Sequence, residues 1–428
     1  MKKKAKIFFS FLILLIFSAG IGLGLTWQAK KNIIAPKAES YSDPYLAFLN
    51  EVYETISQNY WEKTDEEQLI NLFVLASEKA TGEPLIVNNP KKDEFFNEIA
   101  SLLKNKKTDE EKKELAAQIA DVTLANLKPF GRSRLYTQKE ETALSKNVNN
   151  VTETDFYEIL GVSKEAKEEE ISRAYEGQKQ ELEKSQIPGD QEKLAQIEKA
   201  YGVLEDTESK QLYDQAKIEP TMTTKLLTPE ILYLKISKFS PTTVEELQRV
   251  TQKFDQGETL DTLIIDLRDN IGGAIDGLPY FLGPFIGNNQ YAYQFFHQGE
   301  TTDYKTKTGW LGSLLRYKKV VVLINSNSQS SAEVMASVIK KYNVGILIGS
   351  PTKGWGTVEK IFPLKNQPSQ KEKFSIFLVH SLTLREDGEP IEGHGVEPII
   401  NLSDPDWDKQ LLDYFNYPQL ISNLREII

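Results

Sequence analysis

A serine-rich turn between a strand-like and a helix-like segment contains the residues best suited to covalent chemistry. The sequence VVVLINSNSQSSAEVMASVIKK, residues 320–341, reads as an apolar strand, a turn and a helix whose first turn carries Glu333. A serine hydroxyl at such a turn is exposed beside the N–H groups of the helix N-terminus, which stabilise a developing oxyanion. Serines are also ordinary helix caps. The turn therefore predicts either a nucleophile or a capped helix.

A second segment that could take part in chemistry is TLIIDLRDNIGG, residues 262–273. It reads as an apolar strand that ends in charged residues, an asparagine and two glycines. Glycines just beyond a strand let the backbone approach a ligand and direct its N–H groups at an anion or oxyanion. Alone, the pattern does not separate such a site from an ordinary turn.

Together, and in this order, these segments resemble the C-terminal processing peptidases, also called tail-specific proteases, a family of serine peptidases that use a Ser–Lys dyad. IDLRDNIGG is similar to the family's strand ending in Asn-Pro-Gly-Gly, and SNSQSSAEV to its Ser-Ala-Ser-Glu nucleophile turn. GSPTKGWGTVEKIFPL, residues 349–364, is similar to Thr-Phe-Gly-Lys-Gly-Thr-Val-Gln, and GHGVEPII, residues 393–400, to the closing Gly-x-Gly-Ile-x-Pro-Asp. The resemblance covers residues 45–145 and 228–405. It implies a polypeptide substrate and neither a metal nor a cofactor.

The resemblance assigns roles to individual residues of the turn and the glycine pair. It places the nucleophile at Ser330 and retains the acidic residue at Glu333. It places the oxyanion hole at the backbone N–H groups of Gly272 or Gly273 and of Ser331.

The family's catalytic base is the part of the pattern that this sequence lacks. The position of the dyad lysine is occupied by Trp355, and that of a supporting glutamine by Glu359. An indole cannot accept a proton, and a serine without a base is a poor nucleophile. Lys353, two residues earlier on the same strand face, is the candidate for a displaced base. Glu359 and His380 are further candidates, although a histidine in an apolar strand is more often a core residue.

Two functions follow from this pattern. The first is a membrane-anchored, extracytoplasmic serine endopeptidase of the tail-specific type, with Ser330 as nucleophile and Lys353 as base. The second is a catalytically inactive protein of the same fold, which binds polypeptide termini or a partner protein through the former substrate-binding surface. A nearby amine or carboxylate within about 2.6 to 3.2 Å of the Ser330 hydroxyl would favour the first.

Residues 155–214 form a separate helical block that resembles a DnaJ-type J-domain. The opening FYEILGV and the later Ala200-Tyr201 and Tyr213-Asp214 carry the resemblance. The His-Pro-Asp loop, through which J-domains stimulate DnaK-type chaperones, is replaced by Glu183, Lys184 and Ser185. We therefore do not expect a DnaK-type partner. The block stands where the family carries its PDZ module, so it is either a binding or positioning module or a spacer.

The amino terminus predicts membrane attachment. Four lysines within residues 2–6 precede an uncharged run, residues 7–27, that is long enough to span a bilayer. The run exceeds the length typical of a cleaved signal peptide, which favours an uncleaved signal anchor, although Ser18, Ala19 and Gly20 leave cleavage open. The lysine-rich flank stays in the cytoplasm, so the bulk of the chain is expected outside it, at the cell membrane.

Composition excludes several other classes of protein. The 428 residues include 51 Lys and Arg against 62 Asp and Glu, a formal net charge of −11, with three histidines and no cysteine. Without cysteine the chain cannot form disulfides, a thiolate nucleophile or a Cys-ligated zinc site. The acidic balance argues against nucleic-acid binding.

Hydrophobic periodicity then gives the elements that must position these residues. Helical spacing dominates the first half, whereas strand-like runs alternate with helices from about residue 231 onward, which indicates an α/β core. The predicted fold class is α+β. Its expected parts are a signal anchor (1–31), a linker (32–44), a helical N-terminal subdomain (45–150), the J-domain-like insertion (154–216), the tail-specific protease core (225–405) and a C-terminal helix (406–428).

Overall fold

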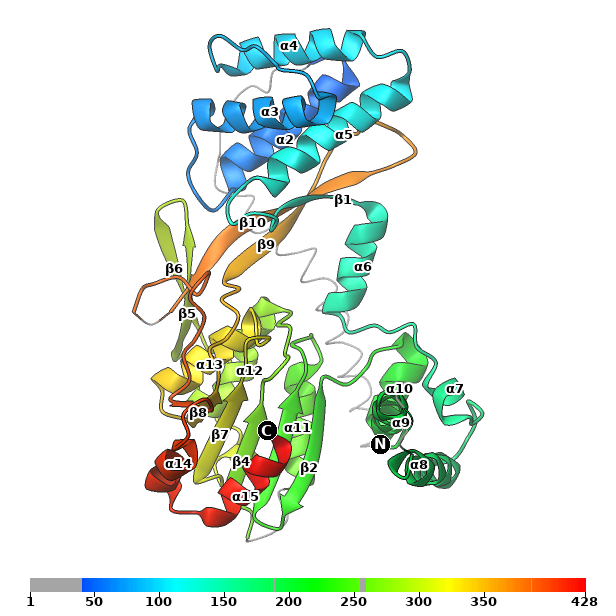
Figure 1. Ribbon diagram of the computed structural model, residues 1–428, viewed down its shortest axis with the longest axis vertical. Coiled ribbons are helices and arrows are strands. Elements are labelled where there is room, and N and C mark those ends of the chain that lie inside the picture. The colour runs from blue at the N-terminus through cyan, green and yellow to red at the C-terminus, as the bar shows by residue number, and fades with distance from the viewer. Residues whose placement is uncertain (1–40, 186, 188, 255–258, 386) are drawn as a thin grey trace, which may run out of the picture. The chain divides into compact units, whose positions relative to one another are not determined.

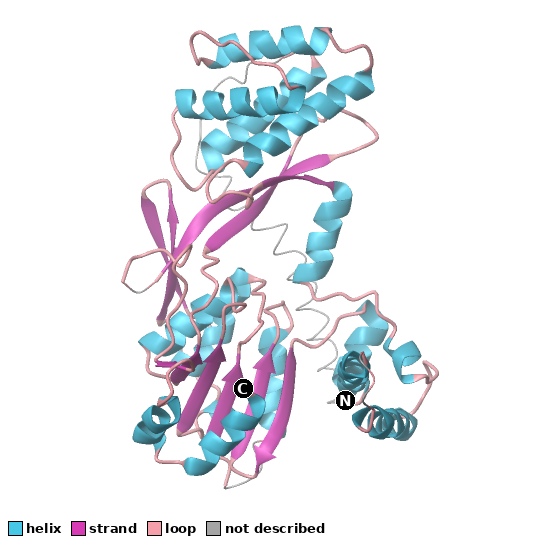
Figure 2. Ribbon diagram, in the orientation of Figure 1, coloured by secondary structure: helices cyan, strands magenta, loops and turns pink. Residues whose placement is uncertain are grey.

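The strands predicted in the C-terminal half form most of a six-stranded sheet in the computed structural model, which describes residues 41–428 except 186, 188, 255–258 and 386 (Figures 1 and 2). The strand order is β11-β8-β7-β4-β3-β2. All neighbours are parallel except the edge strand β2, which is antiparallel to β3. The strands are β2 (Met222–Thr228), β3 (Ile231–Ile236), β4 (Thr262–Asp266), β7 (Lys319–Ile324), β8 (Ile346–Gly349) and β11 (Ile400–Asn401).

Helices cover both faces of this sheet, which explains why its central strands β4 and β7 carry apolar side chains on both faces. Successive side chains of β4 point to opposite faces, so Leu263 and Ile265 join one hydrophobic cluster and Ile264 joins another. The first face is covered by α11 (Thr243–Lys253), α12 (Leu278–Ile286) and α13 (Ser331–Lys341). The second is covered by α14 (Trp407–Phe415) and α15 (Pro418–Ile427).

The predicted single C-terminal helix over residues 406–428 is wrong, because the segment contains two helices. Asn416 adopts a left-handed conformation with φ of 45° and ends α14. Pro418 then begins α15, at a position where proline's missing N–H is not needed. The break lets both short helices lie on the sheet.

A second, antiparallel sheet is organised around one long strand, β10. Strands β1, β9 and β5 all pair with β10, and β6 pairs with β5. A bulge at His380 separates the two registers of the β9–β10 pair. The strands are β1 (Arg134–Thr137), β5 (Tyr291–His297), β6 (Glu300–Lys305), β9 (Thr357–Pro363) and β10 (Phe374–Leu384).

The N-terminal subdomain is helical as predicted except for β1. Its helices are α2 (Pro44–Asn59), α3 (Glu66–Thr81), α4 (Lys92–Lys104), α5 (Asp109–Ala125) and α6 (Gln138–Val148). Asp65, Thr108 and Thr137 begin three of them as capping boxes. The expectation of an all-helical subdomain fails at residues 134–137, because this short segment with a buried Leu135 completes its hydrogen bonds against β10.

The J-domain-like block has a hydrophobic cluster of its own. Its helices are α7 (Phe156–Leu160), α8 (Glu168–Glu183), α9 (Asp190–Leu204) and α10 (Thr207–Ala216). Tyr213 is fully buried; its hydroxyl donates to Thr154 O at 2.8 Å and accepts from Phe156 N–H at 3.1 Å. The tyrosine thereby joins the last helix of the block to the first.

The expected membrane segment at residues 7–27 lies outside the described residues. Among the helices within the described ranges, none has the length and apolar character needed to cross a bilayer.

Candidate active site

Parallel pairing brings the serine turn and the glycine pair to one edge of the sheet. Strands β4 and β7 are neighbours with Asp266 opposite Leu323, so the segments that follow both strands leave the sheet at the same edge. A Cβ atom built on Gly272 would lie 2.6 Å from Ser330 Cβ and 3.0 Å from its Oγ. The two predicted parts of the site are therefore in contact, and only a glycine fits at position 272.

Ser330 has an unusual backbone conformation at the N-cap of α13. Its φ is 56° and its ψ is −123°, a region that non-glycine residues seldom occupy and that costs roughly 1–3 kcal/mol. The residue is partly buried. Strained serines at strand-to-helix turns hold their hydroxyl out toward bound groups, which is the geometry of a nucleophile.

Glu333 holds this strained turn in place. Its Oε2 accepts hydrogen bonds from the N–H groups of Ser330 and Trp355, both at 2.8 Å. Its Oε1 accepts from Thr352 Oγ1 at 2.6 Å and from Gly354 N–H at 2.7 Å. Burial raises the pKa of the Glu333 carboxyl, and the four donors oppose that rise. One buried carboxyl group thus fastens the serine turn to the loop that contains position 355.

Asn270 removes one of the backbone N–H groups that were predicted as oxyanion donors. Its Oδ1 accepts from the Gly272 N–H at 2.8 Å, so that N–H is already occupied. Its amide group donates to Ile236 O at 2.8 Å. The N–H groups of Gly273 and Ser331 make no hydrogen bond to any part of the chain that the structure describes. These two remain the candidates for oxyanion donors.

Residue 355 stands beside the serine, as its alignment with the dyad lysine requires. The N–H groups of Trp355 and Ser330 share one oxygen of Glu333. The Arg132 guanidinium lies 3.3 Å from the centroid of the indole ring, and the indole is among the groups that oppose the rise in the pKa of Glu359 caused by burial. Arg132 also forms an ion pair with Glu392 at 3.0 Å. The sequence position of the family's dyad lysine is thus occupied by an indole that packs against the Arg132 guanidinium.

No hydrogen bond joins the side chains of Lys353 and Ser330, both of which the structure describes. Its side chain is exposed, its Nζ donates to Gln329 Oε1 at 2.6 Å, and the same Nζ lies 5.0 Å from the Trp355 ring centroid. The expected displaced base therefore points along the rim of the site in this conformation.

The other two candidate bases are engaged elsewhere. Glu359 accepts from Thr357 Oγ1 at 2.5 Å, and its burial raises its pKa. His380 stacks on His297 with 4.2 Å between ring centroids, and its Nε2 accepts a hydrogen bond from Lys360 Nζ at 3.2 Å. Burial, aided by these two neighbours, lowers the pKa of His380 to about 3. Among the described residues, no amine, imidazole or carboxylate makes a hydrogen bond to the Ser330 hydroxyl.

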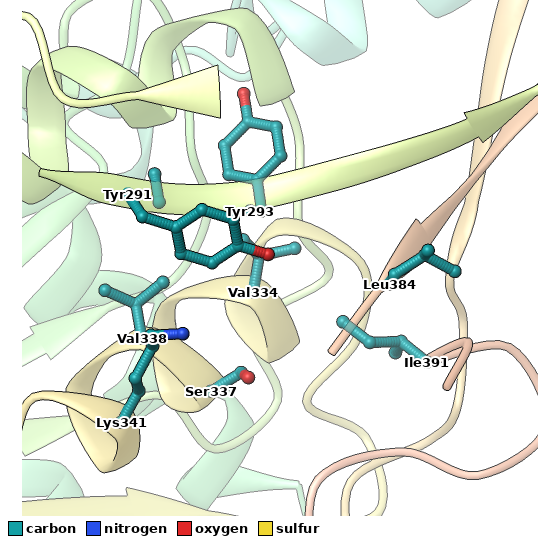
Figure 3. Close-up of a pocket in the computed structure, with 9 residues that line it drawn as sticks. Tyr291, Tyr293, Val334, Ser337, Val338, Lys341, Leu384 and Ile391 are labelled. Carbon is teal, nitrogen blue, oxygen red and sulfur yellow. The ribbon is translucent and has the colours of Figure 1, made fainter. Parts of the chain in front are cut away.

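A small cavity lies along the helix that begins at the serine (Figure 3). It measures about 10 Å³, enough for a water molecule or a methyl group. Val334 and Val338 of α13 form one side, with Tyr291 and Tyr293 of β5 opposite and Leu384 and Ile391 beyond. This cavity cannot hold a cofactor.

Metal binding has no support in the described part of the chain, where no three histidine, aspartate or glutamate side chains gather in a way that could hold an ion.

The residues that replace the His-Pro-Asp loop of a J-domain lie at the end of α8. Glu183 ends α8, Lys184 caps it, and Ser185 Oγ donates to Asp190 at 2.5 Å.

Several contributors to the site were not identified from the sequence. Arg132 lies 223 residues before Trp355 (355 − 132), and no local pattern in GRSRLY indicates that the two side chains meet. Asn270 and Thr352 lie inside the motifs described above, so their polar side chains within these motifs could have indicated that they belong to the site.

Two family descriptions match parts of the chain. Residues 230–402 match "Peptidase family S41", and residues 155–214 match "DnaJ domain". Both matches confirm the resemblances found in the sequence motifs.

Proteins that are similar over most of the chain are also named as carboxy-terminal processing proteases. The carboxy-terminal processing protease CtpA of Bacillus subtilis is 23% identical over 422 residues, 96% of this chain and 79% of that protein. CtpB of the same organism is 23% identical over 383 residues, 87% of this chain and 70% of that protein. Among solved structures, the photosystem II D1 C-terminal processing protease is similar with a TM-score of 0.49 and 14% identity, over 85% of this chain and 94% of that chain.

Proposed function

Starting from the S41 peptidase domain at residues 230–402, we propose that this protein binds polypeptide chains at the Ser330 site without hydrolysing them at a peptidase's rate. The relatives are named as carboxy-terminal processing proteases, which points to the terminal region of a polypeptide as the ligand. The observation that carries the proposal is that Trp355, whose indole packs against the Arg132 guanidinium, stands at the sequence position of the family's catalytic base.

Chemistry gives the size of the expected loss. The hydroxyl of Ser330 needs a neighbouring group that removes its proton as it attacks a carbonyl carbon. Removal of one member of a catalytic set lowers the rate by roughly four to six powers of ten, while the oxyanion donors and substrate contacts still act. Binding depends on the backbone geometry around Gly273 and Ser331, which the replacement of a base leaves intact.

The second candidate is an active peptidase, and one observation favours it. Ser330 retains the strained backbone of a nucleophile, and the nearby N–H groups of Gly273 and Ser331 donate to no acceptor among the described residues. Lys353 would have to leave Gln329 and turn toward the serine when substrate binds. Catalytic hydrogen bonds often form only in the complex with substrate.

Membrane attachment completes the proposal. The uncharged run at residues 7–27 and the lysines before it support a signal anchor with residues 41–428 outside the cytoplasm. The bound polypeptide would then be an exported or membrane-attached chain.

The test compares hydrolysis and binding in the same preparations. Purified residues 41–428, and their Ser330→Ala and Lys353→Ala variants, are incubated with an unfolded model protein, and products are identified by mass. Binding of a fluorescent carboxyl-terminal peptide is measured by anisotropy. Trp355→Lys combined with Glu359→Gln rebuilds the family's pattern, and the adjacent Arg132 cation lowers the pKa of the new lysine.

We expect peptide binding by every variant, no cleavage above the Ser330→Ala level, and Ser330-dependent cleavage in the double variant. Cleavage by the unmodified chain that Ser330→Ala abolishes would overturn the proposal, and its loss in Lys353→Ala as well would establish the displaced dyad. Absence of peptide binding by folded protein would reject both candidates.

A further inference from the structure

One surface segment, residues 305–319, has a charge opposite to that of the rest of the chain. Its sequence KTKTGWLGSLLRYKK contains Lys305, Lys307, Arg316, Lys318 and Lys319 and no acidic residue, whereas the whole chain carries −11. The segment links β6 to β7 and includes a short 3₁₀ turn at Gly312–Leu314. A basic excess of five in fifteen residues of an acidic protein indicates a ligand with negative charge.

The same segment exposes large apolar side chains. Trp310 is 58% exposed and Leu315 is 62% exposed, and Tyr280 of α12 is 37% exposed. The Lys307 ammonium lies 5.0 Å from the Tyr280 ring centroid, which joins the tyrosine to this surface. We call Tyr280, Lys305, Lys307, Trp310, Leu315 and Lys318 the basic–aromatic surface.

Backbone and side-chain contacts hold this surface in shape. Thr308 Oγ1 donates to Tyr280 O at 2.5 Å, and Leu311 N–H donates to Pro284 O at 3.3 Å. The edge of the Trp310 ring lies against Gly287, where an added Cβ would come within 2.9 Å of the indole nitrogen. The Ser313 hydroxyl is 2.8 Å from that of Thr251 on α11. The indole and Leu315 are thus presented to solvent by an ordered segment.

Not every cation in the segment is available to a ligand. Lys319 pairs with Asp261 at 2.5 Å, and Arg316 donates to Leu260 O at 3.0 Å. The side chains of Lys305, Lys307 and Lys318 are exposed. These three, together with the exposed rings, form the part of the surface that could contact a partner.

We propose that the basic–aromatic surface docks on the headgroup region of an anionic phospholipid membrane. Tryptophan and tyrosine rings favour the membrane–water interface, and lysines beside them are attracted to acidic lipids. The inference rests on the membrane attachment in the proposed function. If residues 7–27 are in the bilayer, residues 28–43 allow residue 44 to lie at most about 60 Å from it, so a membrane surface is always within reach.

The test uses residues 41–428, because residues 44–428 form one compact unit and the membrane anchor must not contribute. Co-flotation is measured with vesicles of phosphatidylcholine containing 30% phosphatidylglycerol and with pure phosphatidylcholine vesicles, at low and high salt. The charge variant is Lys305→Gln/Lys307→Gln/Lys318→Gln, and the apolar variant is Trp310→Ser/Leu315→Ser. The matched control, Lys365→Gln/Lys371→Gln/Lys373→Gln, removes three exposed lysines from the β9–β10 loop.

We expect binding to the anionic vesicles only, weakened by salt. Each lysine near a charged membrane contributes about a five-fold factor, so the charge variant should lose about a hundred-fold in partitioning and the control variant less than two- or three-fold. The apolar variant should lose at least ten-fold.

Three results would overturn the inference: no binding of folded protein to anionic vesicles, an equal loss in the control variant, or unchanged binding in the apolar variant. Binding of an acidic polypeptide in place of vesicles, lost in the same variants, would assign the surface to a protein partner instead. None of these assays uses Ser330 or a peptide ligand. Their failure is therefore distinguishable from failure of the proposed polypeptide binding.

Discussion

Replacing Glu333 by glutamine should destabilise the serine turn and the loop at position 355 together. The substitution keeps the size of the side chain but leaves one acceptor oxygen instead of two. If that oxygen continues to accept from Thr352 and Gly354, the new NH₂ group faces the N–H groups of Ser330 and Trp355. Two backbone donors in a buried site then lose their acceptor.

The magnitude follows from those two donors. Leaving a buried polar group without a partner costs roughly 1–3 kcal/mol, so Glu333→Gln should cost about 4 kcal/mol. Unfolding entropy of about 2.1 cal/mol/K per residue, over the compact unit of residues 44–428, converts this cost to a decrease in Tm of about 5 °C.

The assay combines thermal unfolding with amide hydrogen exchange measured by mass spectrometry. Peptides that cover residues 328–334 and 350–357 should exchange faster in Glu333→Gln, while peptides from α2 to α5 stay unchanged. Glu397→Gln, an exposed glutamate, is the matched control. A Tm within 1 °C of the unmodified chain, with equal exchange in both segments, would refute the assignment of Glu333 as the link between them.

Three further predictions concern other parts of the molecule. Burial lowers the pKa of His380 to about 3 in the folded state, so its contribution to stability is present above the unfolded pKa of about 6.5 and is lost as pH falls toward 3. The side chain is only partly buried and solvent screening reduces the effect, so His380→Gln should flatten the urea-unfolding stability curve by up to about 1 kcal/mol per pH unit between pH 6.5 and 4.5. Parallel stability curves for the two proteins would contradict this. Gly273→Ala should lower the free energy of unfolding by at least about 3 kcal/mol, measured by calorimetry, because the new Cβ would lie 1.9 Å from Phe239 O at a φ of 137°. Gly177→Ala, at an open position in a helix, is the control and should raise the free energy of unfolding by roughly 0.5–1 kcal/mol. Similar Tm values for the two variants would show that the backbone can move at residue 273. Tyr213→Phe should lower the free energy of unfolding by roughly 2–4 kcal/mol and speed hydrogen exchange in α7, because it removes the hydrogen-bond partner of two backbone groups. Unchanged exchange in α7 would mean that water replaces the hydroxyl.

The sequence allowed the α/β core to be predicted because its signals are local. The strands TLIID and KVVVLI contain the continuous apolar runs Leu263–Ile265 and Val320–Ile324, and the serine turn follows directly from the second strand. Strand β1 and the β5–β6 hairpin were not predicted, since β1 is four residues long and β6 is almost wholly exposed. Strands β1 and β5 are stabilised by pairing with the distant strand β10, and β6 pairs with β5 in turn; a local pattern does not contain the pairing with β10.

The candidate site, too, was predicted only in part. The family resemblance placed Ser330 and the Gly272 region in one site, whereas the directions of the side chains were not predicted. Lys353 was expected to reach toward the serine, but a hydrogen bond to Gln329 takes its ammonium elsewhere. The occupation of the Gly272 N–H depends on an asparagine rotamer, which residue type alone does not determine.

The pairing of β1 with β10 has a consequence for the order in which the chain can fold. Arg134 lies opposite Phe377, 243 residues later (377 − 134), and Phe48 of α2 contacts Phe374 of the same distant strand. The N-terminal helices are synthesised first, yet one side of their core is supplied by nearly the last part of the chain to appear. During synthesis, the apolar surface of this subdomain that packs on β10 stays uncovered until β10 has been made. A fragment ending near residue 150 should therefore be prone to aggregation, although in sequence it looks like an independent domain.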